Sequence, residues 1–214
     1  MGIVDWIFPK MCVGCRREGE YICPDCQKKL VTPPSICPMC AKPSLDGWTH
    51  RRCRKAYGME RLLVGLPYKG VVQECLKKVK YKSAYDIIQF LYKLCDFGQF
   101  DNSVITSVPM WNQKERERGF NQAKILSELM DDQVDLLERI RETKPMFGLN
   151  KEQRISNIEG AFKINSKSQM GKFSNLERVI LVDDVWTTGA TMRECARILK
   201  IHGAKEVWGV TLAR

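Results

Sequence analysis

The sequence has no long hydrophobic run, and this absence excludes one class of protein at the outset. No stretch of its 214 residues approaches the roughly 20 consecutive apolar residues of a membrane-spanning helix. The opening segment also lacks the basic start and the long apolar run of a secretion signal. We therefore expect a cytoplasmic protein, whose ten cysteines serve as metal ligands, core residues or reactive thiols rather than as disulfides.

Histidine is equally scarce, with two residues, and the sequence offers no Ser-His-Asp set for nucleophilic catalysis. His202 precedes Gly203 near the end of an expected helix, where it suits the helix dipole better than catalysis. No low-complexity tract and no repeat beyond cysteine pairs is present. The net charge of +10 suits a protein that handles phosphates or nucleic acid, although a solvated basic surface explains it equally well.

Cysteine usage divides the chain into two parts. Residues 1–58 hold seven of the ten cysteines in short turns rich in Pro and Gly, whereas residues 59–214 alternate apolar runs with helical patterns. We therefore predict a small module that is stabilised by bound metal and joined to one α/β domain, with the boundary near Tyr57 and Gly58. Cys75, Cys95 and Cys195 fall on apolar faces of the second part and are assigned to its core.

The second part predicts a largely parallel sheet with helices on both faces. A long polar stretch separates its two halves, at residues 144–160. The expected strands span residues 59–68, 104–108, 160–164, 178–182 and 207–212, with a short element at 136–141. The expected helices span residues 71–79, 84–95, 120–130 and 190–201.

Three C-x-x-C units and one His-x-x-Cys unit fill the first part. The two-residue spacing lets both side chains of a unit reach one tetrahedral ion, so four units supply two closed structural zinc sites. The shortest loops favour sequential pairing, with an interleaved cross-brace as the alternative. The predicted ligands are Cys12, Cys15, Cys23 and Cys26 for one ion, and Cys37, Cys40, His50 and Cys53 for the other.

The same module carries basic residues interspersed with aromatic rings, a combination that can bind single-stranded nucleic acid. A solvated module that docks on its neighbour through those rings is an equally weighted alternative. The basic residues are Lys10, Arg16, Arg17, Arg51, Arg52, Arg54 and Lys55, and the rings are those of Trp6, Tyr21 and Trp48.

The segment from Arg178 to Thr191 joins a buried strand, two carboxylates, a hydroxyl-rich turn and a helix. Backbone N–H groups of such a turn can bind a phosphate, and the helix N-terminus adds a favourable partial charge. Asp183 and Asp184, at the end of the strand, can accept hydrogen bonds from two vicinal sugar hydroxyls. The pattern predicts a ribose 5-phosphate ligand, with Thr187, Thr188, Gly189, Ala190 and Thr191 around the phosphate.

This segment resembles the phosphoribosyl diphosphate (PRPP) signature of type I phosphoribosyltransferases. Residues 116–122 (RERGFNQ), Arg154 with Asn157, and residues 160–162, together with the cysteine module, resemble the ComF family of competence-associated phosphoribosyltransferase-like proteins. Many members have a cysteine where this chain has His50. The resemblance implies the type I phosphoribosyltransferase fold preceded by a double zinc ribbon.

The resemblance also implies roles for further residues. Asp183 and Asp184 would hold the ribose hydroxyls, and residues 106–110, including Pro109, would face the pyrophosphate of PRPP. Arg116, Arg118 and Arg154 are candidate contacts to that pyrophosphate, while Lys80 matches a family position of unassigned role. Mg²⁺ is implied as the partner of a diphosphate, and the polar stretch at 147–159 as a lid.

Two functions follow from these expectations. The first is a PRPP-binding protein that transfers a phosphoribosyl group, with partners in the uptake and handling of single-stranded DNA that the family alone implies. The second is a non-catalytic protein on the same fold that senses PRPP or binds nucleic acid. The acceptor of a transfer reaction has no signature in the sequence.

Overall fold

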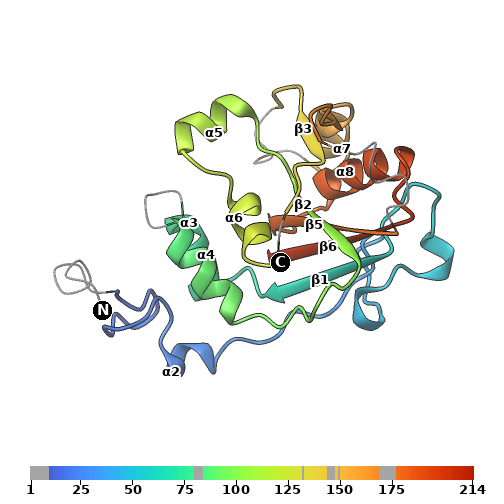
Figure 1. The fold of residues 1–214 in the computed structure, drawn as a ribbon. Coiled ribbons are helices and arrows are strands. Elements are labelled where there is room, and N and C mark those ends of the chain that lie inside the picture. Colours follow the sequence, from blue (N-terminus) through green and yellow to red (C-terminus); the bar gives the residue numbers. More distant parts are fainter. Residues whose placement is uncertain (1–9, 80–83, 132, 144–147, 149, 169–176) are drawn as a thin grey trace.

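The computed structural model describes residues 10–79, 84–131, 133–143, 148, 150–168 and 177–214. Its centre is a four-stranded parallel sheet in the order β1-β6-β5-β2 (Figure 1). These strands span Arg61–Leu66 (β1), Ser103–Ser107 (β2), Arg178–Val185 (β5) and Glu206–Ala213 (β6). The residues from Val179 to Val182 in β5 are fully buried, as expected of a central strand that is covered on both faces.

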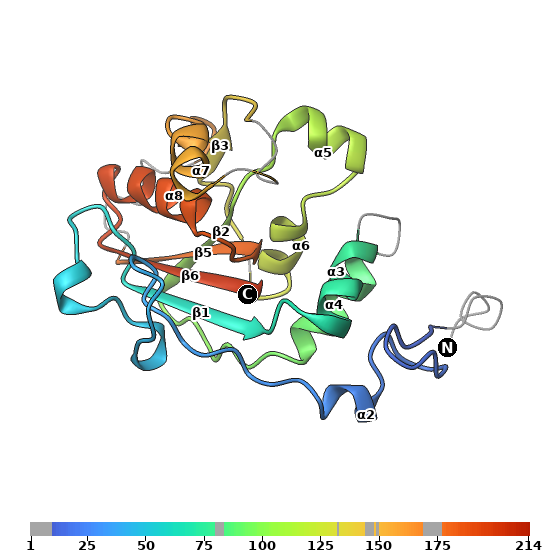
Figure 2. The ribbon, with the colours of Figure 1, turned by 180° about the vertical axis from the view of Figure 1, so that it is seen from behind.

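Helices cover both faces of the sheet (Figures 1 and 2). One face packs against α8 (Ala190–Ile201), which in turn contacts α7 (Lys151–Ile158) and the antiparallel pair β3 (Leu137–Arg139) and β4 (Phe162–Ile164). The other face packs against α3 (Gly70–Lys78), α4 (Ala84–Lys93) and α6 (Gln122–Glu128). The predicted α/β architecture is therefore confirmed, and each face of the sheet has its own hydrophobic cluster.

The described part of the cysteine-rich module has little regular structure. It contains α2 (Pro24–Gln27) and the 3₁₀ turns η1 (Leu45–Gly47) and η2 (Arg51–Cys53). Isolated bridges close two of the turns that carry its cysteine pairs: Met11 with Glu18 around Cys12 and Cys15, and Ile36 with Pro43 around Cys37 and Cys40. The backbone N–H of Glu60 then donates to the Val207 carbonyl, so the chain enters the sheet directly after this module. The boundary near residue 58 stays a prediction.

In the second part of the chain, two helices lie where the sequence predicts none. The helix α5 (Asn112–Arg118) has an entirely polar sequence, so no apolar period marks it, and it ends at Gly119 with φ of 84°. The helix α7 lies in the stretch predicted as a polar connector. It is started by a capping box, in which Asn150 and Gln153 satisfy each other's backbone N–H groups. Ile158 is buried against α8, so this part of the predicted lid is a packed helix.

Three of the sequence predictions fall partly or wholly outside the described residues. Trp6 and Lys80 lie there, as do several residues of the predicted lid. Among the described residues no helix combines the length and the apolar character needed to cross a membrane.

Candidate ligand site and metal centres

The first cysteine cluster has the geometry of a four-thiolate metal site. The Sγ atoms of Cys12, Cys15, Cys23 and Cys26 all lie within 4.8 Å of one another. A tetrahedral zinc with Zn–S bonds of about 2.3 Å requires S···S separations of roughly 3.8 Å, and Cys15 Sγ lies 3.5 Å from Cys23 Sγ. The donor set therefore fits a closed zinc site.

Backbone hydrogen bonds prepare this cluster for a cation. Burial of the Cys12 thiol acts to raise its pKa, but backbone N–H groups of Cys23, Cys15 and Gly14 outweigh burial and lower the pKa to about 6. The N–H of Cys23 lies 3.4 Å from Cys12 Sγ. Because the thiolate is the form that binds metal, these donors favour metal binding at neutral pH.

The second cluster combines three cysteines with a histidine. The ligand atoms of Cys37, Cys40, His50 and Cys53 also lie within 4.8 Å of one another, so the structure brings the ligands together in the sequential grouping. Backbone N–H groups of His50, Cys40 and Met39 outweigh the effect of burial and lower the pKa of Cys37 to about 7.

The hydrogen bonds of His50 orient its ring as a metal ligand. Its Nδ1 lies 3.4 Å from Cys40 Sγ and 3.9 Å from Cys53 Sγ. Its Nε2 lies 2.9 Å from the Pro43 carbonyl oxygen. A carbonyl only accepts, so Nε2 carries the proton and Nδ1 of the neutral ring directs its lone pair at the cysteines. His50 thus completes a donor set that fits zinc.

The carboxyl end of β5 carries the acidic pair. Asp183 and Asp184 are half-buried near the last position of the strand. Successive strand residues point to opposite faces, and Leu181 packs on the α8 side while Val182 packs on the α6 side. Asp183 therefore faces the α8 side of the sheet and Asp184 the α6 side.

Each carboxyl group has a basic partner on its own side. Burial raises the pKa of Asp183 well above its usual range, and the adjacent charge of Asp184 adds to this, while Arg139 of β3 acts in the opposite direction. Burial likewise raises the pKa of Asp184, opposed by the Val185 N–H and by Arg118 at the end of α5. Both carboxyl groups are therefore protonated more readily than exposed aspartates, and one arginine near each opposes this effect.

The loop between β5 and α8 is tightly built around Gly189. This residue has φ of 72°, and a Cβ there would lie 2.2 Å from the ring of Trp186, which is 3% exposed. Only glycine fits both conditions. A small hollow of about 20 Å³ lies in this loop and is lined by Asp183, Val185 and residues 186–192. The backbone of the predicted phosphate turn thus borders the hollow together with an acidic residue.

The segment after β2 lies beside this site. The Val108 N–H donates to the Val182 carbonyl, 2.8 Å away, and the Val108 carbonyl accepts from the Asn121 side chain at 3.0 Å. Asn121 also caps the N-terminus of α6 through the Ala123 N–H. Pro109, which directly follows Val108, is therefore held at the carboxyl edge of the sheet next to β5.

The other predicted site residues lie farther out. Arg116 is exposed on α5, and Arg118 of the same helix donates to the Gln122 side chain at 2.5 Å. Arg154 is half-buried on α7. The structure brings Arg118 into the electrostatic neighbourhood of Asp184, and the contacts of Arg116 and Arg154 with a ligand stay predictions.

The remaining thiols and His202 have structural surroundings. Cys75 and Cys195 are fully buried, Cys95 is partly buried, and burial raises the pKa of each. His202 is the C-cap of α8, where its Nδ1 lies 2.8 Å from the Ile198 carbonyl oxygen.

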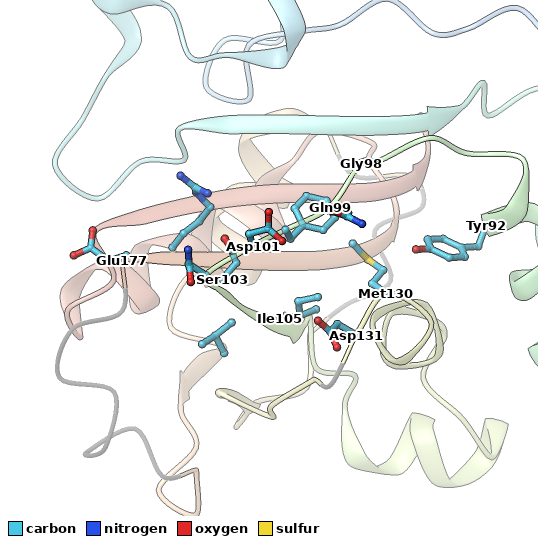
Figure 3. Close-up of a pocket in the computed structure, with 13 residues that line it drawn as sticks. Tyr92, Gly98, Gln99, Asp101, Ser103, Ile105, Met130, Asp131 and Glu177 are labelled. Atoms are coloured by element: carbon cyan, nitrogen blue, oxygen red, sulfur yellow. The ribbon is translucent and has the colours of Figure 1, made fainter.

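A further cavity lies at the opposite ends of the sheet strands, away from the acidic pair. It has a volume of about 870 Å³ and lies where β2 and β5 begin, with Ser103 and Glu177 on its wall (Figure 3). Residues 169–176, which directly precede Glu177, lie outside the described residues. Because parallel sheets bind ligands at the carboxyl ends of their strands, we assign no function to this cavity.

Sequence reasoning did not find Arg139, Trp186 or Arg193. Arg139 stacks over Phe162 of the neighbouring strand β4 and acts on the pKa of Asp183. Arg193 donates to the Thr188 carbonyl of the loop. Trp186 could have been found from the sequence, because it lies three residues before Gly189 in the motif. The contacts of the two arginines could not, because no local sequence pattern marks them.

Comparison with known families agrees with this architecture. A double zinc ribbon domain matches residues 3–56, and a phosphoribosyl transferase domain matches residues 117–214. Together with the parallel sheet and the two cysteine clusters, these matches define the class of the molecule. It is a phosphoribosyltransferase-fold protein with an N-terminal zinc-binding ribbon.

Full-length relatives narrow the class. DNA utilization protein YhgH of Escherichia coli is 27% identical, over 94% of this chain and 96% of its own length. Competence protein F of Haemophilus influenzae is 26% identical, over 95% of this chain and 90% of its own. Competence protein ComFC of Bacillus subtilis is 29% identical, over 92% and 86%. The chain is therefore similar, along nearly its whole length, to proteins named for DNA utilization and for competence.

Proposed function

We propose that this protein binds PRPP, with the 5-phosphate on the loop Thr187–Thr191 and the ribose hydroxyls on Asp183 and Asp184. The observation that carries the proposal is the hollow between β5 and α8, which is lined by Asp183 and by the entire loop. A phosphate at this place would accept hydrogen bonds from loop N–H groups at the N-terminus of a 12-residue helix.

The electrostatics of the acidic pair support a diol ligand. Each carboxyl group accepts one backbone N–H, from Asp184 at 2.9 Å and from Val185 at 2.7 Å, and burial still raises both pKa values, so further donors would stabilise the ionised forms. Vicinal hydroxyl groups supply two such donors without adding charge. Arg139 and Arg118, one near each carboxyl, favour the ionised forms that accept these hydrogen bonds.

Mg²⁺ and the pyrophosphate of PRPP would occupy the same edge of the sheet. Mg²⁺ binds mainly to substrate oxygens and water, and the carboxylates of Asp183 and Asp184 are suitable oxygen donors close by. The segment that contains Pro109 is anchored beside β5, and Arg118 lies near Asp184, so these residues are the nearest candidates for the pyrophosphate. Arg116 and Arg154 are the outer candidates.

The reaction class that suits this site is displacement at C1 of the ribose. The bond from C1 to the pyrophosphate oxygen breaks, pyrophosphate leaves with the electron pair, and a nucleophile forms a new bond to C1. Positioning and charge stabilisation of the leaving group supply most of the catalysis in such a step. Arginines beside the pyrophosphate would therefore contribute more than an acid or base residue.

The two cysteine clusters are proposed as structural zinc sites. Each supplies four protein ligands, which leaves no open position for a reacting water. The proposed ligands are Cys12, Cys15, Cys23 and Cys26 in the first cluster, and Cys37, Cys40, His50 and Cys53 in the second.

The cellular role is proposed from the relatives, whose names refer to DNA utilization and to competence. A cytoplasmic protein that handles imported single-stranded DNA would use PRPP in this pathway or respond to its concentration. Basic residues of the ribbon, such as Arg16, Arg17, Arg51 and Arg52, are exposed and supply a surface for DNA. Non-catalytic sensing of PRPP is the second candidate function, because the sequence carries no signature for an acceptor of the phosphoribosyl group.

Calorimetry with PRPP and Mg²⁺ tests the ligand site. We expect the double variant Asp183→Asn with Asp184→Asn to bind at least about 100-fold more weakly, because each lost charge-assisted hydrogen bond costs about 1.5–3 kcal/mol. Asp86→Asn, on the exposed surface of α4, is the matched control and should bind as the wild type does. No binding by the wild type, or equal affinity of the double variant, overturns the assignment.

Turnover and DNA binding need separate measurements. Release of pyrophosphate in the presence of candidate acceptors, including single-stranded DNA, identifies a transferase, and its absence with intact PRPP binding identifies a sensor. DNA affinity should fall steeply with salt, and less steeply once Arg16, Arg17, Arg51 and Arg52 are replaced by glutamine. A salt-independent affinity rejects the basic surface.

A further inference from the structure

One side chain connects the second cysteine cluster to the loop Thr187–Thr191, which we call the phosphate loop. Arg193 lies in the first turns of α8, and its Nε donates to the Pro38 carbonyl at 2.6 Å. Pro38 directly follows Cys37, a ligand of the second cluster. The Nη1 of the same guanidinium donates to the Thr188 carbonyl at 2.8 Å. The two segments are 150 residues apart in the sequence and share one rigid planar group.

The guanidinium is held in place by further contacts. It lies over the ring of Trp186, 5.3 Å from the ring centroid, and the same ring packs against Gly189. The negative charges of Cys37 and Cys40 act on the pKa of Arg193, which burial lowers. Arg193 therefore lies between the cluster and the loop with both a hydrogen bond and a charge interaction toward the cluster.

The contact with Thr188 fixes the direction of a phosphate-binding group. In a trans peptide the carbonyl oxygen and the next N–H point in opposite directions, and no cis peptide is found among the described residues. The Thr188 carbonyl points at Arg193, so the Gly189 N–H points away from it. Within the described chain this N–H has no acceptor. A rotation of this peptide would turn the donor away from its present direction.

The first cluster is joined to the domain differently. The carbonyl of Tyr21, which lies between its cysteine pairs, is 3.9 Å from Cys75 Sγ on α3, and the Tyr21 ring packs on Phe90 of α4. These contacts lie on the face of the sheet that α8 does not cover. Any link between a metal site and the phosphate loop should therefore belong to the second cluster.

We propose that Arg193 is a positioning residue that couples metal binding at the second cluster to ligand binding at the phosphate loop. Zinc there fixes the segment Cys37–Cys40, the Pro38 carbonyl fixes the guanidinium, and the guanidinium holds the Thr188 peptide in the orientation that presents the Gly189 N–H. The inference rests on the proposed function, since it presumes that the loop binds a phosphate. Coupling is reciprocal, so a bound phosphate ligand must also retain zinc at the second cluster.

The first arm of the test measures the wild type and needs one variant, His50→Ala, to assign the signal. Zinc release to a chromophoric chelator is followed on the full chain, with and without ribose 5-phosphate, and the phase that is missing in His50→Ala is assigned to the second cluster. We expect ribose 5-phosphate to lower the equilibrium constant for zinc release from the second cluster about 10-fold, which is within the usual range of coupling between two sites. The equilibrium constant for release from the first cluster should not change. Equal effects on both phases, or none, overturn the coupling.

The second arm uses substitutions on α8. Arg193→Gln should bind ribose 5-phosphate about 10-fold more weakly in calorimetry and should lose the effect of the ligand on zinc release, whereas Arg193→Lys should retain part of both. Arg197→Gln, one turn along the helix and paired with Glu194, is the matched control and should behave as the wild type does. Unchanged linkage in Arg193→Gln overturns the role of this residue.

The outcomes separate this inference from the proposed function. If the wild type does not bind ribose 5-phosphate, the phosphate site itself is wrong and the coupling fails with it. If the wild type binds and Arg193→Gln binds equally well, the phosphate site stands and the coupling alone is rejected.

Discussion

The two cysteine clusters of the ribbon stabilise different parts of the same domain. The first contacts α3 and α4 through apolar packing, with Ile22 and Cys23 fully enclosed in the hydrophobic cluster on that face. The second lies on the α8 side, where Arg193 connects it to the phosphate loop by hydrogen bonds. Both metal-binding turns thus pack on the domain through apolar residues, such as Ile22 for the first and Ile36 for the second, and the second adds a directional polar contact to the loop.

This difference has a physical consequence. Apolar packing is non-directional and tolerates small movements, so loss of the first metal should lower stability without changing the geometry of a remote site. A planar guanidinium with two short hydrogen bonds fixes the relative position of the two groups that it contacts. Loss of the second metal should therefore change ligand binding as well as stability.

The largest expected effects come from removing one buried ligand of each cluster. Cys12→Ser and Cys37→Ser should each lose one of about two zinc ions per chain, since each cluster offers four ligands. Both should be destabilised by several kcal/mol, a fraction of the roughly 10–16 kcal/mol that structural zinc supplies to small peptides. Only Cys37→Ser should also lose affinity for ribose 5-phosphate, as measured by calorimetry beside metal analysis.

The comparison between the clusters fails if a folded Cys12→Ser protein loses ligand affinity as fully as Cys37→Ser does. Far-UV circular dichroism provides the control for folding of both variants. A zinc content near one in the wild type, purified without chelator, contradicts the participation of His50.

A matched pair of glycine substitutions compares the phosphate loop with the first cluster, with smaller expected losses of stability than the cysteine variants. Gly189→Ala places a Cβ 2.2 Å from the Trp186 ring at a φ of 72°, and should cost about 2–4 kcal/mol. Gly14→Ala, in the first cluster, places a Cβ 2.8 Å from Val71 Cγ1 and 3.0 Å from Cys26 Sγ, both side-chain atoms at an allowed backbone conformation, and should cost about 1–2 kcal/mol. Urea unfolding measures both values.

Ligand binding distinguishes the two glycines further. Gly189→Ala should abolish binding of ribose 5-phosphate, while Gly14→Ala should retain it. Similar losses of stability in the two variants, with binding retained in both, contradict the tight construction of the loop around Trp186.

The pH dependence of stability tests the acidic pair. Burial and the neighbouring charge of Asp184 raise the pKa of Asp183, so above about pH 4 the folded protein binds a proton that the unfolded chain has lost. Stability is therefore highest below the unfolded pKa and falls as pH rises toward the folded pKa. Asp183→Asn should be more stable than the wild type at neutral pH, by about 1–3 kcal/mol, with the difference shrinking toward pH 4.

Thermal unfolding of the protein without ligand, at neutral pH and at about pH 5, provides the measurement. Asp25→Asn, on an exposed carboxylate beside the first cluster, is the control and should show no such gain. An Asp183→Asn protein that is less stable than the wild type at neutral pH shows that the carboxylate is well satisfied in the free protein.

Local patterns predicted a large part of this structure. The helix α8 occupies the predicted residues 190–201, because Met192, Cys195 and Leu199 recur at helical spacing and are all buried against the sheet. The strand β5 and the turn that follows it were also predicted, since a fully apolar run followed by two carboxylates has few alternatives. Such features depend only on residues that are neighbours in the chain.

The parts that could not be predicted depend on contacts between distant segments or on polar helices. The sequence does not predict α7 because burial on it is concentrated at its last residue, Ile158, so its sequence shows no apolar helical period. It does not predict α5 because that helix has no buried residue. Arg139 and Arg193 reach the acidic pair and the loop from β3 and α8, so only the folded chain shows their partners. The ligand contacts predicted from the sequence stay predictions, and the structure adds Arg139 and Arg193 beside the residues concerned.

The smallest expected effect concerns Arg17, which is the counterpart of Arg193 beside the first cluster. Its Nη1 lies 2.7 Å from Asp25, but both side chains are more than half exposed, whereas Arg193 is partly enclosed between Pro38 and Thr188. Exposed ion pairs contribute little because water and salt screen them. Arg17→Gln should therefore leave the thermal midpoint, the zinc content and the affinity for ribose 5-phosphate unchanged. A loss of zinc from the first cluster in this variant would show that a surface arginine orients that cluster too, and the contrast between polar and apolar attachment would no longer hold.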